Sequence, residues 1–260
     1  MPITMIVTVL VVSLLGLCVG AVAAHGAEAV MGRRRLGRPA CPYCAQAYTP
    51  LQWSATLALI TGQGRCCHCG KFFRVPRLLC EVFVALCWAL LVGRYGLSWR
   101  VLLGMVGLLP LAMIMVTDLE TKRVPNLIML PSIAVMLLIG IFAGPALPLL
   151  REWDWLTVIY GALAGFGVLR VLVWLGVAVF GEGALGEGDI TLATYVGAFL
   201  GFPMVIEALL LAFVLGGLGA VIVLVTRRGT MRTAIAYGPY IILGCAITLI
   251  FGSDIVQWLY

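Results

Sequence analysis

The sequence has 260 residues, of which 63% are hydrophobic and only 11% are charged. Soluble domains carry about 25% charged residues, so this composition excludes a water-soluble globule and a disordered chain. At about 20 apolar residues per membrane-spanning helix, the length accommodates about eight spans. The net charge of +6 favours basic loops at an anionic lipid surface. No basic patch interleaved with aromatic residues indicates a nucleic-acid partner.

Long, continuously apolar runs predict an all-α fold, a polytopic membrane helix bundle of about eight spans with a small cytoplasmic zinc-binding loop domain. A membrane β-barrel is excluded because its strands alternate apolar and polar residues. We expect a first transmembrane span within 1–30, a cytoplasmic cysteine-rich loop over 31–77 and a transmembrane core over 78–260. The predicted spans lie at about 3–24, 78–93, 100–117, 126–143, 155–180, 190–202, 204–225 and 235–252.

The basic residues orient these predicted spans. They gather in the first, third and seventh connecting segments, at 33–77, 122–123 and 227–232, which lie on one side of an eight-span bundle. The positive-inside rule makes that side cytoplasmic. The opposite side holds only Arg94, Arg100 and Arg151. Arg170 is the exception, because it falls inside an apolar run, where it either snorkels, pairs two helices or has a function.

Two carboxylates are predicted at the cytoplasmic ends of spans. Asp118 ends the third span and Asp189 opens the sixth, so topology alone places them at one depth. Two close carboxylates in a low dielectric share one proton, and such a pair can activate water against a carbonyl group. Gly186 and Gly188 permit a close backbone approach that would orient a substrate strand. The alternative is that each aspartate only stabilises a helix end.

Two C-x-x-C pairs in the first loop, separated by 21 residues, are typical of a structural zinc site with four thiolates. A cytoplasmic position would keep these thiols reduced, which favours metal binding over disulfides or free thiols. Four protein ligands leave no open position for catalysis. The neighbouring Cys67 and His68 are alternative ligands. The predicted ligands are Cys41, Cys44, Cys66 and Cys69.

Taken together, these residues resemble the type IV prepilin peptidases, the leader peptidases of bacterial pilus and type II secretion systems. The resemblance rests on the paired C-x-x-C motifs, on Asp118 followed by Pro125-Asn126, on G-x-G-D at 186–189 and on Tyr237-Gly238-Pro239. Members of that family are multi-pass inner-membrane aspartic endopeptidases. They cut the short basic leader from prepilins or pseudopilins at the cytoplasmic face, after a glycine. The resemblance implies that Asp118 and Asp189 are the catalytic pair and that the four cysteines bind zinc.

Many members of that family also methylate the new amino terminus with S-adenosylmethionine. This sequence departs from the family pattern at two places. The segment 20–24 lacks the asparagine of the usual G-S-F-L-N motif, and Glu81 follows Pro76 by five residues rather than three. N-methyltransferase activity, and with it a need for S-adenosylmethionine, is therefore left open. The alternative interpretation of Glu81 is a helix-start carboxylate.

Two other functions remain as alternatives. A proton-coupled membrane transporter also needs carboxylates within the membrane, and Glu207 and Arg170 are the residues that would serve it. A non-catalytic assembly subunit of a pilus or secretion system would use the zinc loop to bind partners. For the peptidase, we expect acidic residues at the cytoplasmic mouth, Glu120, Glu182 and Glu187, to attract the basic leader of the substrate.

Overall fold

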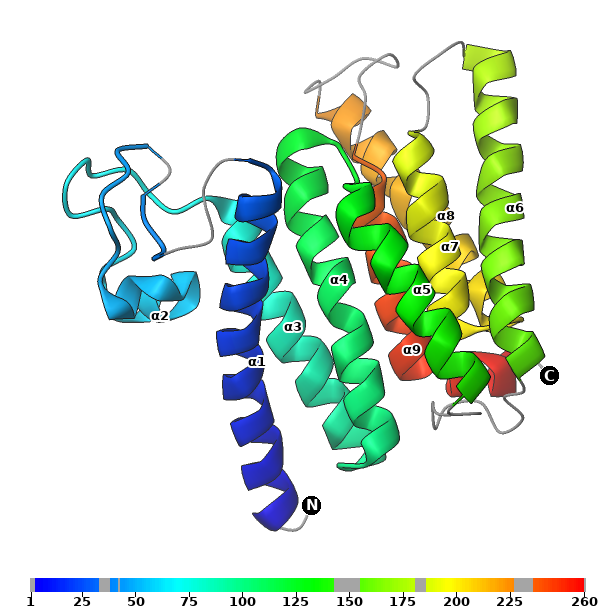
Figure 1. Cartoon of the computed structure of the whole chain (residues 1–260), viewed down its shortest axis with the longest axis horizontal. Helices are drawn as coiled ribbons and strands as arrows, with labels where there is room; N and C mark the ends of the chain where they lie inside the picture. Colours follow the sequence, from blue (N-terminus) through cyan, green and yellow to red (C-terminus); the bar gives the residue numbers. More distant parts are fainter. Residues whose placement is uncertain are drawn as a thin grey trace. The chain divides into compact units, whose positions relative to one another are not determined.

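The computed structural model describes residues 3–32, 38–41, 43–142, 155–180, 186–226 and 236–259. Over these residues the chain forms nine α-helices and one short 3-10 helix, with two isolated β-bridges and no strand (Figure 1). The polypeptide divides into two compact units, Met1–Glu120 and Thr121–Tyr260. The helices are α1 (Ile3–Val30), α2 (Ala55–Ile60), α3 (Val75–Tyr95), α4 (Trp99–Thr121), α5 (Asn126–Phe142), α6 (Trp155–Phe180), α7 (Glu187–Leu200), α8 (Met204–Val225) and α9 (Gly238–Leu259).

The first unit is built on close packing of α1 against α3, with the cysteine loop and α2 between them in the sequence (Figure 1). Gly16 and Gly20 make this packing possible, because a β-carbon at either position would stand 2.7 Å from the Cα of Ala85 or of Glu81. Small residues that let backbones approach are the usual device of membrane helix pairs, which lack a hydrophobic driving force in lipid. The cysteine loop is therefore held at both ends by a tight helix pair.

The second unit is organised around α7, a short helix that packs against α5, α6, α8 and α9. Gly161 and Gly165 of α6 face the backbone of Gly197 and Ala193 in α7 without room for a β-carbon. Tyr195 and Phe199 of α7 are fully buried, and their rings stack with centroids 6.0 Å apart. This central position explains how a helix of only 14 residues is accommodated, because protein rather than lipid surrounds it.

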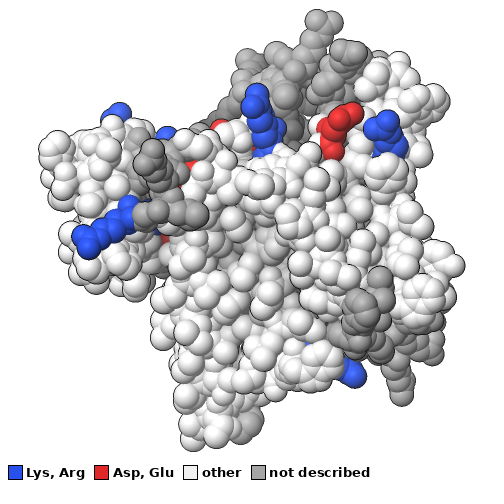
Figure 2. Space-filling view, in the orientation of Figure 1, with Lys and Arg blue, Asp and Glu red and all other residues white. Residues whose placement is uncertain are grey.

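Five of the described helices, α1, α3, α4, α6 and α8, are long and apolar enough to cross a membrane, and α5 and α9 are shorter apolar helices. Large apolar side chains such as Leu14, Val22 and Phe213 are more than 60% exposed, as expected for lipid-facing surfaces. Most of the face drawn in Figure 2 is accordingly uncharged. The predicted all-α, multi-pass membrane fold is confirmed.

Each predicted span coincides with a described helix, and the differences lie at the ends. Helix α3 begins at Val75 rather than at residue 78, because Pro76 occupies its first turn, where a missing N–H costs nothing. Helix α7 begins at Glu187, so Asp189 lies within its first turn. Several residues used for the predicted orientation and for attraction of the leader lie outside the described residues, namely 33–35, 151, 182, 227, 228 and 232.

Candidate active site and metal centre

The two C-x-x-C segments fold into knuckles with the same backbone hydrogen bonds. In the first, the Cys41 N–H donates to Gln46 O at 2.7 Å, and the Ala45 N–H donates to Cys41 O at 3.0 Å. In the second, Cys66 bonds at the corresponding positions with Lys71 O at 2.9 Å and the Gly70 N–H at 2.9 Å. Each knuckle is flanked by an isolated bridge, Ala40 to Ala47 and Arg65 to Phe72. The loop thus contains two equivalent halves.

The two knuckles bring the four predicted ligand sulfurs together. All four Sγ atoms lie within 4.8 Å of one another, with 3.5 Å between Cys41 and Cys69 and 3.7 Å between Cys44 and Cys66. Thiolates bound tetrahedrally to zinc at about 2.3 Å stand about 3.8 Å apart, so the cluster fits that ion. Cys67 and His68 are exposed and outside the cluster, and none of the nine cysteines forms a disulfide.

Backbone amides make the first sulfur of each knuckle acidic. The N–H groups of Cys69 and His68 point at the Cys66 sulfur and lower its pKa to about 6. For Cys41, burial opposes ionisation, but the amides of Tyr43 and Cys44 outweigh it and lower the pKa. Hydrogen bonding to a thiolate stabilises the form that binds metal. The cluster therefore has both the spacing and the electrostatics of a metal centre.

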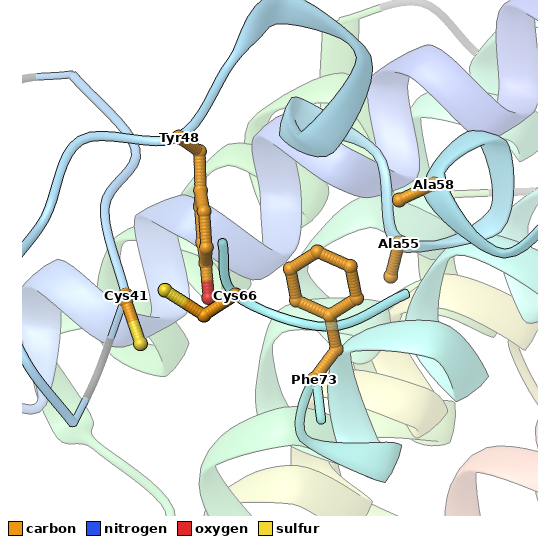
Figure 3. Close-up of a cluster of buried hydrophobic side chains, with 6 residues drawn as sticks. All are labelled: Cys41, Tyr48, Ala55, Ala58, Cys66 and Phe73. Carbon is orange, nitrogen blue, oxygen red and sulfur yellow. The ribbon is translucent and has the colours of Figure 1, made fainter. Parts of the chain in front are cut away.

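A small hydrophobic core supports the knuckles. Figure 3 shows the rings of Tyr48 and Phe73 beside Cys66 and Ala55. Each ring belongs to the residue seven positions after the first cysteine of its knuckle, and the two rings meet edge to face with centroids 5.2 Å apart. Aromatic pairs of this geometry contribute about 0.5–1.5 kcal/mol beyond their buried area. The internal symmetry therefore includes side chains as well as backbone.

Glu81 joins the cysteine loop to the membrane helices. It is fully buried in the second turn of α3, and its carboxylate accepts hydrogen bonds from the Ser54 hydroxyl at 2.6 Å and from two N–H groups at the start of α2, those of Ala55 at 2.7 Å and Thr56 at 2.9 Å. Arg77 lies 3.7 Å from the same carboxylate. Glu81 is thus a helix-capping carboxylate, but it caps α2 rather than its own helix.

Asp189 is fixed at the start of α7 by the two glycines of its motif. The Asp189 N–H donates to Gly186 O at 3.0 Å, and in return the Gly186 N–H donates to Asp189 Oδ2 at 3.2 Å. Gly188 presses against Val124, where a β-carbon would stand 2.8 Å from the Val124 Cβ. Asp189 itself is 7% exposed. The motif therefore holds a nearly buried carboxylate against the turn that precedes α5.

Tyr237 stands just before α9 and packs against α8. Its ring rests on Gly216 of α8, where a β-carbon would come within 2.8 Å of Cε2, and lies 6.3 Å from the ring of Tyr240. Burial and the negative charge of Asp189 raise the pKa of Tyr237 to about 12. The phenol therefore keeps its proton at neutral pH.

Asp118 occupies the last turn of α4 and is 4% exposed. Two residues later, the Glu120 carboxylate is paired with Arg74 at 2.8 Å, and its side chain is 5% exposed. Arg74 and Glu120 line a cavity of about 620 Å³ together with Tyr43, Lys71 and Phe72. Because Arg74 neutralises Glu120, this carboxylate is less available to a basic leader than the sequence suggests. Glu187, by contrast, is 89% exposed and lies 3.9 Å from Arg170.

Of the predicted groups of residues, the structure brings the four cysteines together. Gly186, Gly188 and Asp189 are neighbours in the sequence and share one helix start. Asp118 belongs to the other compact unit, so its approach to Asp189 stays a prediction. Sequence reasoning missed the capping role of Glu81, for which Ser54 before α2 was the only local signal.

Fold and site together define a multi-pass helical membrane protein with a four-cysteine cluster that could hold a metal ion and a buried aspartate at a glycine-flanked helix start. The model of the type IV leader peptidase family matches residues 105–221, a range that contains both Asp118 and Asp189. The chain is thus similar to the type IV leader peptidases over this range, as its motifs indicate.

Several curated proteins are similar in sequence to this chain over most of its length. A prepilin leader peptidase/N-methyltransferase of Bacillus subtilis (strain 168) is 28% identical over 224 residues, which cover 85% of this chain and 84% of that protein. Proteins of the same name from Pseudomonas putida and Pseudomonas aeruginosa are 29% and 27% identical, over 83% and 85% of this chain and 72% and 74% of their own lengths. No solved structure matches the chain significantly.

Proposed function

We propose that this protein is an aspartic endopeptidase that removes the basic leader of type IV prepilins or pseudopilins, with Asp118 and Asp189 as its catalytic pair. The observation that carries the proposal is the start of α7, where Gly186 and Gly188 hold a nearly buried Asp189 against the turn at Val124. Val124 follows Asp118 by six residues, a length of chain that spans at most about 20 Å and is compatible with the proposed pairing. The peptidase family match over both aspartates adds support.

In the proposed reaction the two carboxyl groups share one proton. The ionised carboxylate takes a proton from a water molecule, whose oxygen attacks the carbonyl carbon of the scissile peptide. The protonated carboxyl group gives its proton to the carbonyl oxygen, which yields a neutral tetrahedral diol. The carboxyl group that took the water proton gives it to the leaving nitrogen, while the other carboxylate takes a proton from one diol hydroxyl. The C–N bond breaks, an amine and a carboxylic acid are released, and the pair is again singly protonated.

The surroundings of Asp189 also support a way of holding the substrate. Gly186 is exposed and extended, with φ −84° and ψ 145°, so a substrate strand can lie along its backbone. We place this mouth on the cytoplasmic side of the bacterial inner membrane, because the predicted basic loops share that side. The apolar helix of a prepilin or pseudopilin would stay in lipid beside the exposed apolar faces of the helices, while its leader reaches the aspartates.

The four-cysteine cluster is proposed to hold a structural zinc ion. Bound zinc would join the two equivalent knuckles, because Cys41 and Cys44 come from one half and Cys66 and Cys69 from the other. The protein contributes the amides that stabilise the thiolates and the Tyr48–Phe73 pair that packs beside them. Since all four positions are filled by thiolates, zinc would organise the loop rather than take part in hydrolysis.

N-methylation of the new terminus is a second proposed activity, favoured by the relatives named peptidase/N-methyltransferase. It would require S-adenosylmethionine. Glu81 is not available for this step, because three donors and Arg77 already surround its carboxylate. Mass spectrometry of the processed terminus decides the question: one added methyl group supports the activity, and an unmodified terminus in the presence of S-adenosylmethionine contradicts it.

The peptidase is tested by reconstituting the purified protein in liposomes with a synthetic prepilin and following cleavage by mass spectrometry. We expect cleavage after the glycine of the leader, and we expect Asp118→Asn and Asp189→Asn each to abolish it. Glu207→Gln is the matched control, because this carboxylate lies in the first turn of α8, away from the motif. A transporter or an inert assembly subunit predicts an intact prepilin with every one of these proteins.

A further inference from the structure

We infer that residues 50–60 anchor the cysteine loop at the membrane surface, with their apolar side chains inserted among the phospholipids. This surface anchor consists of the 3-10 helix Pro50–Trp53, the linking Ser54 and helix α2. Its partner is the lipid bilayer itself. The inference is independent of the proposed function, because it concerns the position of the loop and not the reaction at the aspartates.

The surface anchor lies in an uncharged stretch of an otherwise basic segment. Residues 39–64 contain no Asp, Glu, Lys, Arg or His, whereas Arg65, Lys71 and Arg74 follow closely. In soluble domains about 25% of the residues are charged, so a stretch of this length without any charge is unusual for a loop surrounded by water. The composition therefore suits contact with a less polar surrounding.

Two polar side chains of the surface anchor point inward. Gln52 is buried, and its Nε2 donates to Gln63 O at 3.3 Å and to Arg65 O at 3.1 Å. Ser54 is buried as well, and its hydroxyl donates to Glu81 Oε2 at 2.6 Å. These groups are satisfied by the protein and need no water.

The large apolar side chains of the surface anchor point outward instead. Ile60 is 76% exposed, and Leu51 and Trp53 are each 46% exposed. The indole Nε1 of Trp53 donates to Tyr48 O at 3.3 Å, so the ring needs no hydrogen bond from solvent. Apolar patches on a protein surface mark interaction sites, and Trp is enriched where protein crosses the membrane interface. Polar groups inside and apolar groups outside indicate a lipid-facing surface.

Contacts within the first compact unit fix the depth of the surface anchor. Its helix α2 is attached to α3, because the Glu81 carboxylate accepts hydrogen bonds from two N–H groups at the start of α2. The backbone of Glu81 packs in turn on Gly20 of α1, where a β-carbon would stand 2.7 Å from the Glu81 Cα. Gly20 belongs to the apolar run of α1, which continues to Ala24 before His25. The start of α2 is thus level with a part of α1 that lies in or next to lipid.

The length of α1 gives the same depth. At a rise of 1.5 Å per residue, Gly20 stands about 25 Å along the helix from Ile3. The hydrocarbon core is about 30 Å thick and the headgroup regions lie beyond it, so α2 meets the boundary between acyl chains and headgroups. Figure 1 shows α2 lying across the direction of α1, as an interfacial helix does.

Neighbouring residues continue the surface on both sides. Leu79 and Val82, which flank Glu81 in α3, are exposed and extend the apolar surface along a membrane-spanning helix. Arg65, whose carbonyl oxygen accepts from Gln52, is also exposed and is suited to pair with a lipid phosphate. The surface anchor is therefore continuous with the lipid-facing surface of the first compact unit.

The test is photolabelling of the unmodified, full-length protein in nanodiscs of phosphatidylethanolamine and phosphatidylglycerol. Part of the phosphatidylglycerol carries a diazirine near the ester end of one acyl chain, and mass spectrometry locates the labelled residues. We expect labels on residues 51–60 at a level comparable to that on Leu14 and Val22 of α1, and only background labelling of the exposed Cys67 and His68.

Labelled α1 residues together with unlabelled residues 51–60 would overturn the inference. That result is the one expected if water, a second copy of the chain or another protein covers the segment. Labelling of Cys67 and His68 as strong as that of residues 51–60 would overturn it too, because the loop would then have no defined lipid-facing side.

A pair of variants tests the contribution of the apolar face. Ile60→Asp replaces the most exposed apolar side chain of the surface anchor with a charge, so labelling of Leu57 should fall about tenfold. Gln63→Asp adds the same charge at an exposed position that is already polar, and it should leave this labelling unchanged. Equal effects of the two substitutions would show that Ile60 does not insert into lipid.

Discussion

Gly188 packs closely against Val124 beside Asp189, and replacing this glycine tests the importance of that contact. The β-carbon of Gly188→Ala would stand 2.8 Å from Val124 Cβ, 3.2 Å from Cγ2 and 3.4 Å from the Val124 nitrogen. These contacts involve backbone-anchored atoms, so the helix start has to move rather than a flexible side chain. Overpacking of this kind costs about 1–3 kcal/mol, and a displacement of about 1 Å at a catalytic group lowers a rate about 100-fold.

Gly186→Ala is the matched comparison within the same motif. Its β-carbon would meet only Asp189 Oδ2 at 3.6 Å and Gly188 N at 3.9 Å, and its backbone conformation suits any residue. We therefore expect prepilin cleavage to fall about 100-fold in Gly188→Ala but less than tenfold in Gly186→Ala. The double variant Gly188→Ala, Val124→Gly should recover activity. Equal losses in both single variants, or no recovery in the double variant, would refute the packing argument.

Three further predictions concern the cysteine loop. Cys66→Ser should lower the zinc content from one ion per chain to near zero by elemental analysis, whereas Cys67→Ser should keep it; equal content in both would contradict the proposed ligand set. Ala45 has φ +59° where its counterpart Gly70 has φ +68°, so Ala45→Gly should stabilise the loop by about 1 kcal/mol and Gly70→Ala destabilise it similarly, as read from the temperature of metal release. Glu81→Ala leaves a buried cation unpaired and should cost about 3–5 kcal/mol, so hydrogen exchange at the amides of α2 should accelerate; unchanged protection would show that the cap is dispensable.

The apolar runs and the spacing of the cysteines were the basis for predicting the membrane helices and the cysteine cluster. Continuous runs located each membrane helix, because lipid leaves few other solutions for a backbone that must satisfy its own hydrogen bonds. The C-x-x-C spacing identified Cys41 and Cys66 as the first ligands of two zinc knuckles, because tetrahedral thiolate coordination needs that local turn. The apolar run that restarts at Ile190 placed the carboxylate of Asp189 at a helix start.

What the sequence did not reveal depends on contacts between distant segments. Glu81 is 27 residues from Ser54, and no local pattern relates an α3 carboxylate to the start of α2. The pairing of Arg74 with Glu120 spans 46 residues and alters the expected role of that carboxylate. The symmetry of the loop is also hard to recognise in the sequence, since the two halves share only the C-x-x-C cysteines and an aromatic residue seven positions after the first cysteine. The spacing of residues within one segment does not predict contacts of this kind between distant segments.

The central claim is that Asp118 and Asp189 act as one catalytic unit, and single-turnover cleavage of a prepilin by the two Asn variants and their double variant tests it most directly. Residues that act as a unit have non-additive effects. We predict that either single substitution lowers the cleavage rate as far as the double substitution does. A single variant that still cleaves, or rate losses that multiply in the double variant, would contradict the account.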